Sequence, residues 1–166
     1  MIVGKDGQAK FLARAALLAL AAGVEDVDWD TFFDKDGGGF PPTEDYFGLF
    51  TWPGAEGGPK EKPSWKAATA LSRMLATSRF AGDLSGLLGL PEGAYALAFV
   101  DERDGHHTLA AWDAVADRTT PVTVPAPAGA SGYVCVTDLG QPGCEPSSGA
   151  ASVTLTDRAL YVRFDR

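Results

Sequence analysis

Basic residues are scarce in this sequence of 166 residues. It has 14 Lys and Arg against 22 Asp and Glu, giving a net charge of −8 and a pI near 4.6. Proteins that bind a nucleic-acid backbone need clustered Lys and Arg, so this composition argues against a nucleic-acid partner. No basic amphipathic segment is present that would favour an anionic membrane surface. Acidic balance by itself indicates little more than solubility.

Long apolar runs are also missing. The apolar run at 15–22 is far shorter than the roughly 20 residues that a membrane-spanning helix requires. Lys10 and Arg14 would interrupt the apolar region of an N-terminal signal peptide. We therefore expect no transmembrane span and no signal peptide within these residues. If the chain is part of a longer protein, this expectation says nothing about whether that protein is secreted.

Only two cysteines occur, Cys135 and Cys144. They flank a turn that contains Gly and Pro, and they could pair across it, which would be weak evidence for an oxidising compartment. No His or Cys partners stand at zinc-ligand spacing. The acidic run 26–36 fails as a calcium loop because Thr31 replaces the required glycine and Gly37 stands where a bidentate glutamate belongs. We expect no metal and no cofactor.

The first half of the chain has the helix, strand, loop and helix order that is typical of one repeating unit in a parallel α/β structure. An apolar helix is predicted from Gly7 to Gly23, with Asp6 as its N-cap. A strand is predicted over 24–31, with Val27, Trp29 and Thr31 on one face and Asp26, Asp28 and Asp30 on the other. A loop rich in aromatics and glycines follows at 35–62, and a second amphipathic helix begins at Pro63. A complete eight-stranded α/β barrel needs about 250 residues, so a barrel interpretation makes this chain a fragment.

The second half is predicted to be all-β. Short segments separated by Gly, Pro, Asp and Ser clusters indicate an antiparallel sheet or small sandwich. Asp104-Gly105 predicts a hairpin turn, and His106-His107 then falls at its tip. We place the boundary near residue 80, which gives units 1–79 and 80–166. The predicted strands are 95–100, 108–113, 121–125, 132–139, 151–155 and 160–164.

The order of motifs resembles clan A glycoside hydrolases, with glycoside hydrolase family 39 (β-xylosidase/iduronidase-like) the closest. Residues 8–24 resemble the seventh barrel helix, and Asp28-Trp29-Asp30 is similar to the end of the eighth strand. Residues 47–49 and 62–67 resemble the following loop and the last barrel helix. The tail, 90–157, is similar to the β-sandwich that follows such barrels. The implied fold is therefore the end of a (β/α)8 TIM barrel joined to an antiparallel β-sandwich, α/β plus all-β.

This resemblance implies O-glycosyl bond hydrolysis by the whole protein, and an oligosaccharide or polysaccharide as ligand. Family members carry two catalytic glutamates on barrel strands four and seven, which precede the matching region, so no residue of this chain is expected to be catalytic. Trp29 would pack against a sugar face, although a core aromatic between sheet and helix is the alternative. Asp30 and Asp34 could accept hydrogen bonds from sugar hydroxyls, or be solvated loop acids. Phe33 and Tyr46 complete the candidate substrate-binding set, although loop-anchoring core positions are their more common role.

Two further hypotheses compete with the hydrolase fragment. One is a free-standing carbohydrate-binding or interaction module with a helix-capped β-sandwich, and the other is a structural domain with no ligand. On the fragment hypothesis the protein is secreted, and its missing N-terminal barrel portion is a partner. An unpaired strand and apolar helix faces would then be exposed, which favours self-association.

Overall fold

The computed structural model describes residues 4–35, 46–145 and 148–165. The first half contains two helices, α1 (Lys5–Ala21) and α2 (Pro63–Leu75). The described residues also form seven strands, and all of these follow α2 in the sequence. They are β1 (Ser78–Asp83), β2 (Ala94–Asp101), β3 (His107–Asp113), β4 (Thr120–Val124), β5 (Gly132–Thr137), β6 (Ala151–Leu155) and β7 (Leu160–Asp165).

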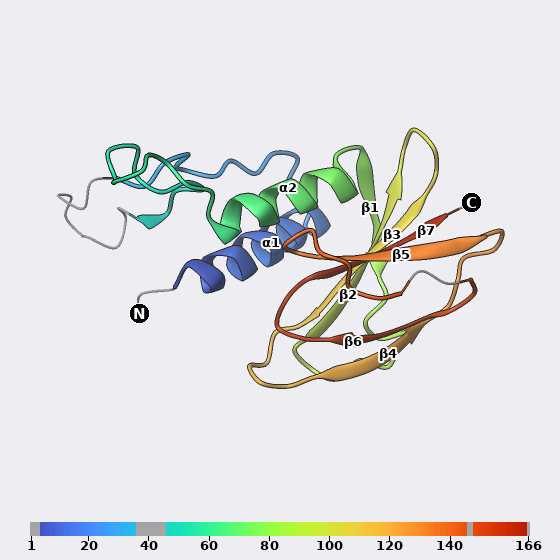
Figure 1. Ribbon diagram of the computed structural model, residues 1–166. Coiled ribbons are helices and arrows are strands. Elements are labelled where there is room, and N and C mark those ends of the chain that lie inside the picture. Colours follow the sequence, from blue (N-terminus) through green and yellow to red (C-terminus); the bar gives the residue numbers. More distant parts are fainter. Residues whose placement is uncertain (1–3, 36–45, 146–147, 166) are drawn as a thin grey trace.

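The strands form two antiparallel sheets, which confirms the predicted antiparallel β structure. Five strands pair in the order β1-β2-β3-β7-β5, and β4 pairs with β6. The two helices pack on one face of the five-stranded sheet, and the β4–β6 pair packs on the other (Figure 1). The result is a small α+β structure with an apolar core on each side of its larger sheet.

Burial on both faces explains the nearly continuous apolar residues of β2 and β3. Within β2, Ala96 belongs to the core beneath β4 and β6, whereas Leu97 and Phe99 belong to the core beneath the helices. In β3, Leu109 faces the first core and Trp112 the second. Successive side chains of a strand point to opposite faces, so a strand covered on both sides has no polar stripe.

Helix α1 begins earlier than the sequence predicted. Asp6 lies in its first turn, and the N-cap is Gly4, which contributes no side-chain hydrogen bond. The predicted glycine stop is confirmed: Gly23 has a φ of 82°, and the Val24 amide donates to the Ala19 carbonyl at 3.0 Å. This arrangement closes the last turn and needs the left-handed backbone conformation that glycine adopts most readily.

The predicted helix at Pro63, all six predicted strands and the Asp104-Gly105 hairpin are present within one to two residues of their expected bounds. Strand β1 was missed because its sequence has no run of β-branched residues and contains Gly82, where the pairing with β2 is irregular. Its Phe80 contacts Phe99 with ring centroids 5.8 Å apart. Tertiary pairing with β2 therefore makes this segment a strand, and the predicted boundary at residue 80 falls inside it.

The predicted strand over 24–31 was wrong in its hydrogen bonding. Among the residues that the structure describes, none forms a backbone hydrogen bond with the backbone of 25–30. Pairing begins only where the Thr31 carbonyl accepts from the Leu49 amide, followed by a parallel bridge between Phe33 and Phe50. An extended segment without a neighbouring strand cannot form a ladder. The predicted alternation still describes its side chains, because Trp29 is half-buried whereas Asp28 and Asp30 are exposed.

Cys135 and Cys144 form a disulfide with a Cα–Cα distance of 5.3 Å. It ties β5 to the turn that follows it. A Cβ atom at the neighbouring Gly143 would lie 2.4 Å from Leu160 Cδ1, so a larger residue there would force the Leu160 side chain to shift. Neither of the two helices is long and apolar enough to cross a bilayer, as far as the described residues go.

Candidate functional site

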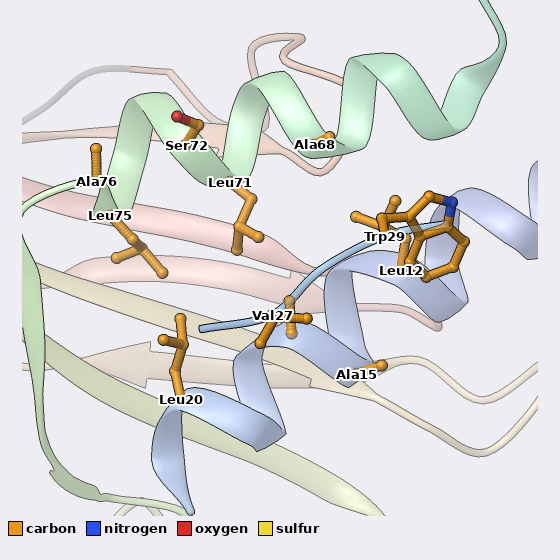
Figure 2. Close-up of a pocket in the computed structure, with 11 residues that line it drawn as sticks. Leu12, Ala15, Leu20, Val27, Trp29, Ala68, Leu71, Ser72, Leu75 and Ala76 are labelled. Carbon is orange, nitrogen blue, oxygen red and sulfur yellow. The ribbon is translucent and has the colours of Figure 1, made fainter. Parts of the chain in front are cut away.

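An apolar groove of about 300 Å³ runs between α1 and α2. The segment 24–33 passes over it, and Val27 and Trp29 point into it toward the two helices (Figure 2). The groove is thus bounded by a helix, an extended chain and a second helix. Its lining residues are Leu12, Ala15, Ala16, Leu20, Val27, Trp29, Ala68, Leu71, Ser72, Leu75 and Ala76.

Trp29 belongs to the helix-facing side of this segment. Its ring is half-buried and lies 6.4 Å from the ring of Phe11, and its indole N–H donates to the Phe47 carbonyl at 2.9 Å. Asp28 and Asp30 are exposed and do not line the groove. The segment therefore presents apolar side chains to the helices and carboxylates to the opposite side, which is the alternation of a β-strand.

A network of buried polar side chains surrounds the backbone of 46–48. The Lys62 ammonium donates to Asp34 Oδ1 at 2.7 Å and to the Tyr46 carbonyl at 2.7 Å. The same Asp34 oxygen accepts from the Gly48 amide at 2.9 Å. From α1, Gln8 donates to the Phe47 carbonyl at 2.7 Å. Lys62 and Asp34 are only 1% and 6% exposed, so this is a buried ion pair.

Gly48 is needed for this network to form. A Cβ atom at this position would lie 2.2 Å from the Asp34 amide nitrogen and 2.3 Å from the Phe33 carbonyl carbon. Both neighbours are backbone atoms, which cannot move aside as a side chain can. The close approach of two backbone segments explains a glycine here, where φ does not demand one.

Four aromatic rings cluster at the end of the same segment. Phe32 stacks on Phe50 with centroids 4.9 Å apart and meets Trp65 edge-on at 6.0 Å. Phe33 completes the cluster at 4.9 Å from Phe32. Phe32 is 50% exposed and Phe33 37% exposed. The sequence predicted Phe33 as a site residue but not Phe50, which lies in the predicted loop, or Trp65, which lies in the first turn of α2.

The predicted site residues are thus only partly brought together. Trp29, Asp34 and Tyr46 meet around 46–48. Phe33 lies in the aromatic cluster, and Asp30 is exposed on the other side of the segment. Asp34 is an ion-pair partner rather than a solvated loop acid. Across the described ranges, no three His, Cys, Asp or Glu side chains are placed to hold a metal ion.

Large apolar side chains are exposed mainly in the first half of the chain. Nine of the eleven exposed ones among the described residues occur before position 53, and only Leu87 and Val115 occur after it. Such concentration is typical of a surface that another polypeptide covers. The nine are Phe11, Leu18, Val24, Val27, Phe32, Phe33, Tyr46, Phe47 and Trp52.

No protein-family model matches the sequence, and neither does any curated protein. Among solved structures, the chain is similar to a GH30 endoxylanase from Clostridium papyrosolvens C71, with a TM-score of 0.58 and 10% identity. The match covers 97% of this chain and 39% of the endoxylanase. An Anoxybacillus alpha-amylase also matches, with a TM-score of 0.48, 15% identity and coverage of 98% and 32%. The chain is therefore similar in fold to part of a glycoside hydrolase structure and spans well under half of its length. Membership of family 39 is not confirmed.

Proposed function

We propose that this chain is the C-terminal portion of a clan A glycoside hydrolase that cleaves O-glycosyl bonds. The residues before β1 close its TIM barrel, and the residues from β1 onward form an accessory β-sandwich. The proposal rests on the order of elements around the groove, which is helix, extended segment and helix. The exposed apolar side chains are concentrated on this same half of the molecule.

The unpaired backbone of 25–30 supports the barrel interpretation. In a parallel barrel each strand has a neighbour on both sides, and helices cover its outer face. Val27 and Trp29 already face two helices, while both edges of the segment are open. The fold similarity to 39% of an endoxylanase supports the same conclusion, because the remainder of such a protein would supply the neighbouring strands.

The proposal assigns the bond-cleaving chemistry to residues outside this chain. Glycoside cleavage requires a pair of carboxylates that flank the bond. Glu25, Glu56 and Glu61 are all exposed at the surface of the first half. This chain would contribute substrate-binding residues at the C-terminal end of the last strand, for which Phe33 and Tyr46 are the candidates, whereas Trp29 faces the helices. The disulfide supports our further proposal that the protein is secreted.

The competing proposal, a free-standing carbohydrate-binding module, is less well supported. Such modules commonly bind sugars on exposed aromatic rings. Every aromatic residue described between 78 and 165 is buried or half-buried. All the exposed aromatic rings among the described residues lie in the first half, next to the groove and its loops.

The activity of the isolated chain tests the proposal. We expect residues 1–166 to release no reducing ends from xylan and no aglycone from aryl glycosides, because the catalytic carboxylates lie elsewhere. The longer polypeptide encoded by the surrounding gene is expected to hydrolyse at least one of these substrates. Measurable turnover by purified residues 1–166 would contradict the assignment of the catalytic carboxylates to another region.

A further inference from the structure

We infer that the buried Asp34–Lys62 ion pair and Gln8 are positioning residues that hold the Tyr46–Gly48 backbone, so that the exposed side chains of Tyr46 and Phe47 form part of a carbohydrate-binding surface. The choice of a sugar ligand rests on the proposed function. The positioning itself rests on the hydrogen bonds that these three side chains form. Asp34 would then act by holding the loop in place and would not contact the sugar.

The ion pair locks the loop because its charges have no access to water. A buried ammonium or carboxylate is costly unless it is paired and hydrogen-bonded. Lys62 bonds to Asp34 and to the Tyr46 carbonyl, and Asp34 bonds to the Gly48 amide. Moving 46–48 away would remove a partner from both charges at once. The loop position and the burial of the pair therefore depend on each other.

Phe47 lies between the Tyr46 carbonyl and the Gly48 amide, and its own backbone is bonded to other parts of the chain. The Phe47 carbonyl accepts from Gln8 of α1 and from the Trp29 indole. Gln8 also donates to the Gly48 carbonyl at 3.2 Å. The backbone of three consecutive residues is thus fixed by α1, by the segment over the groove and by the residue that precedes α2.

The side chains that this backbone carries are free to meet a ligand. Tyr46 and Phe47 are 56% and 44% exposed, although the backbone carbonyl of each accepts side-chain hydrogen bonds. Rigid presentation of exposed rings lowers the entropic cost of binding. Aromatic faces suit the apolar C–H face of a pyranose. The loop also follows the C-terminal end of segment 24–33, where an α/β barrel binds its substrate.

Hydrogen exchange followed by NMR on residues 1–166 tests the positioning. We expect Lys62→Met to speed exchange of the Gly48 amide and the Trp29 indole N–H at least tenfold, while amides of β3 keep their rates. Lys60→Met, at an exposed lysine two residues away, should match the wild type. Gln8→Met removes one donor and no charge, and it should speed hydrogen exchange of the Trp29 indole N–H several-fold. This variant tests the inference if Lys62→Met does not fold. Unchanged exchange at both sites in a folded variant would overturn the inference.

Titration with xylohexaose separates this inference from the proposed function. We expect shifts at Tyr46 and Phe47 in the wild type, at least tenfold weaker binding in Lys62→Met, and wild-type binding in Lys60→Met. Wild-type binding that Lys62→Met leaves unchanged would overturn positioning while the sugar ligand stands. Faster exchange in Lys62→Met with no xylohexaose shift in the wild type would support the locked loop and count against the sugar-binding function.

Discussion

Replacing Trp112 with alanine is expected to lower the free energy of unfolding by about 3–5 kcal/mol, the range for a large aromatic residue lost from a packed core. Trp112 is 1% exposed and stacks on Tyr95 with ring centroids 4.8 Å apart and an interplanar angle of 17°. Its core also contains Leu17 of α1 and Met74 of α2. The cavity would therefore open between the sheet and both helices.

Urea unfolding followed by two probes measures this effect. Far-UV circular dichroism reports the helices, and amide NMR intensities of β2 and β3 report the sheet. We expect both transitions to move together, because one core joins the two layers. Leu87→Ala, at a side chain that is 80% exposed, should change stability by less than about 0.5 kcal/mol. A Trp112→Ala variant that loses sheet stability while its helices keep theirs would contradict the shared core.

Asp113→Asn is expected to lower the free energy of unfolding by about 2–3 kcal/mol, because it removes the negative charge and replaces one of the two accepting oxygens with an NH2 group that cannot accept from Arg118. Asp113 is fully buried. It accepts from Arg118 Nε at 2.6 Å and Nη2 at 2.8 Å, from Thr120 Oγ1 at 2.6 Å and from the Val115 amide at 3.0 Å. These bonds join the end of β3 to the start of β4. Asp117→Asn, an exposed change in the same loop, is the matched control.

The same carboxylate predicts how stability depends on pH. Hydrogen bonds from Arg118 are the main cause that lowers the pKa of Asp113 to about 2, from 3.8. The folded state therefore binds fewer protons than the unfolded state between these values, so the contribution is complete above pH 4 and is lost as pH falls toward 2. The stability difference between wild type and Asp113→Asn should shrink over this interval. A difference that stays constant from pH 5 to pH 2 would contradict the assigned pKa.

Local sequence patterns were sufficient to predict the all-β half. Residues 94–165 alternate short apolar segments with Gly, Pro and Asp turns, so each strand is specified by its own residues. Strand β1 was the exception, because Ser78–Asp83 becomes a strand only through pairing with β2. The error at 24–31 has the opposite cause: its alternation is that of a strand, but the described chain provides no neighbour to pair with it.

The candidate site was less predictable because its contacts join residues distant in sequence. Lys62 and Asp34 are 28 positions apart, and Gln8 lies 39 positions from Phe47. Nothing in the local sequence distinguishes Lys62 from an exposed lysine before a helix. The resemblance directed attention to Trp29 and Tyr46, but their connection through the backbone of 46–48 depends on how α1, the extended segment and α2 pack together.

Hydrogen exchange of the amides of 25–30 tests most directly whether this chain closes a larger barrel. In residues 1–166 alone, these amides should exchange at nearly unprotected rates, because they lack backbone partners among the described residues. In the longer polypeptide encoded by the surrounding gene, they should slow by about a thousandfold, roughly 4 kcal/mol of opening free energy, as strands pair on both edges. Equal, rapid exchange of these amides in both proteins would contradict the account.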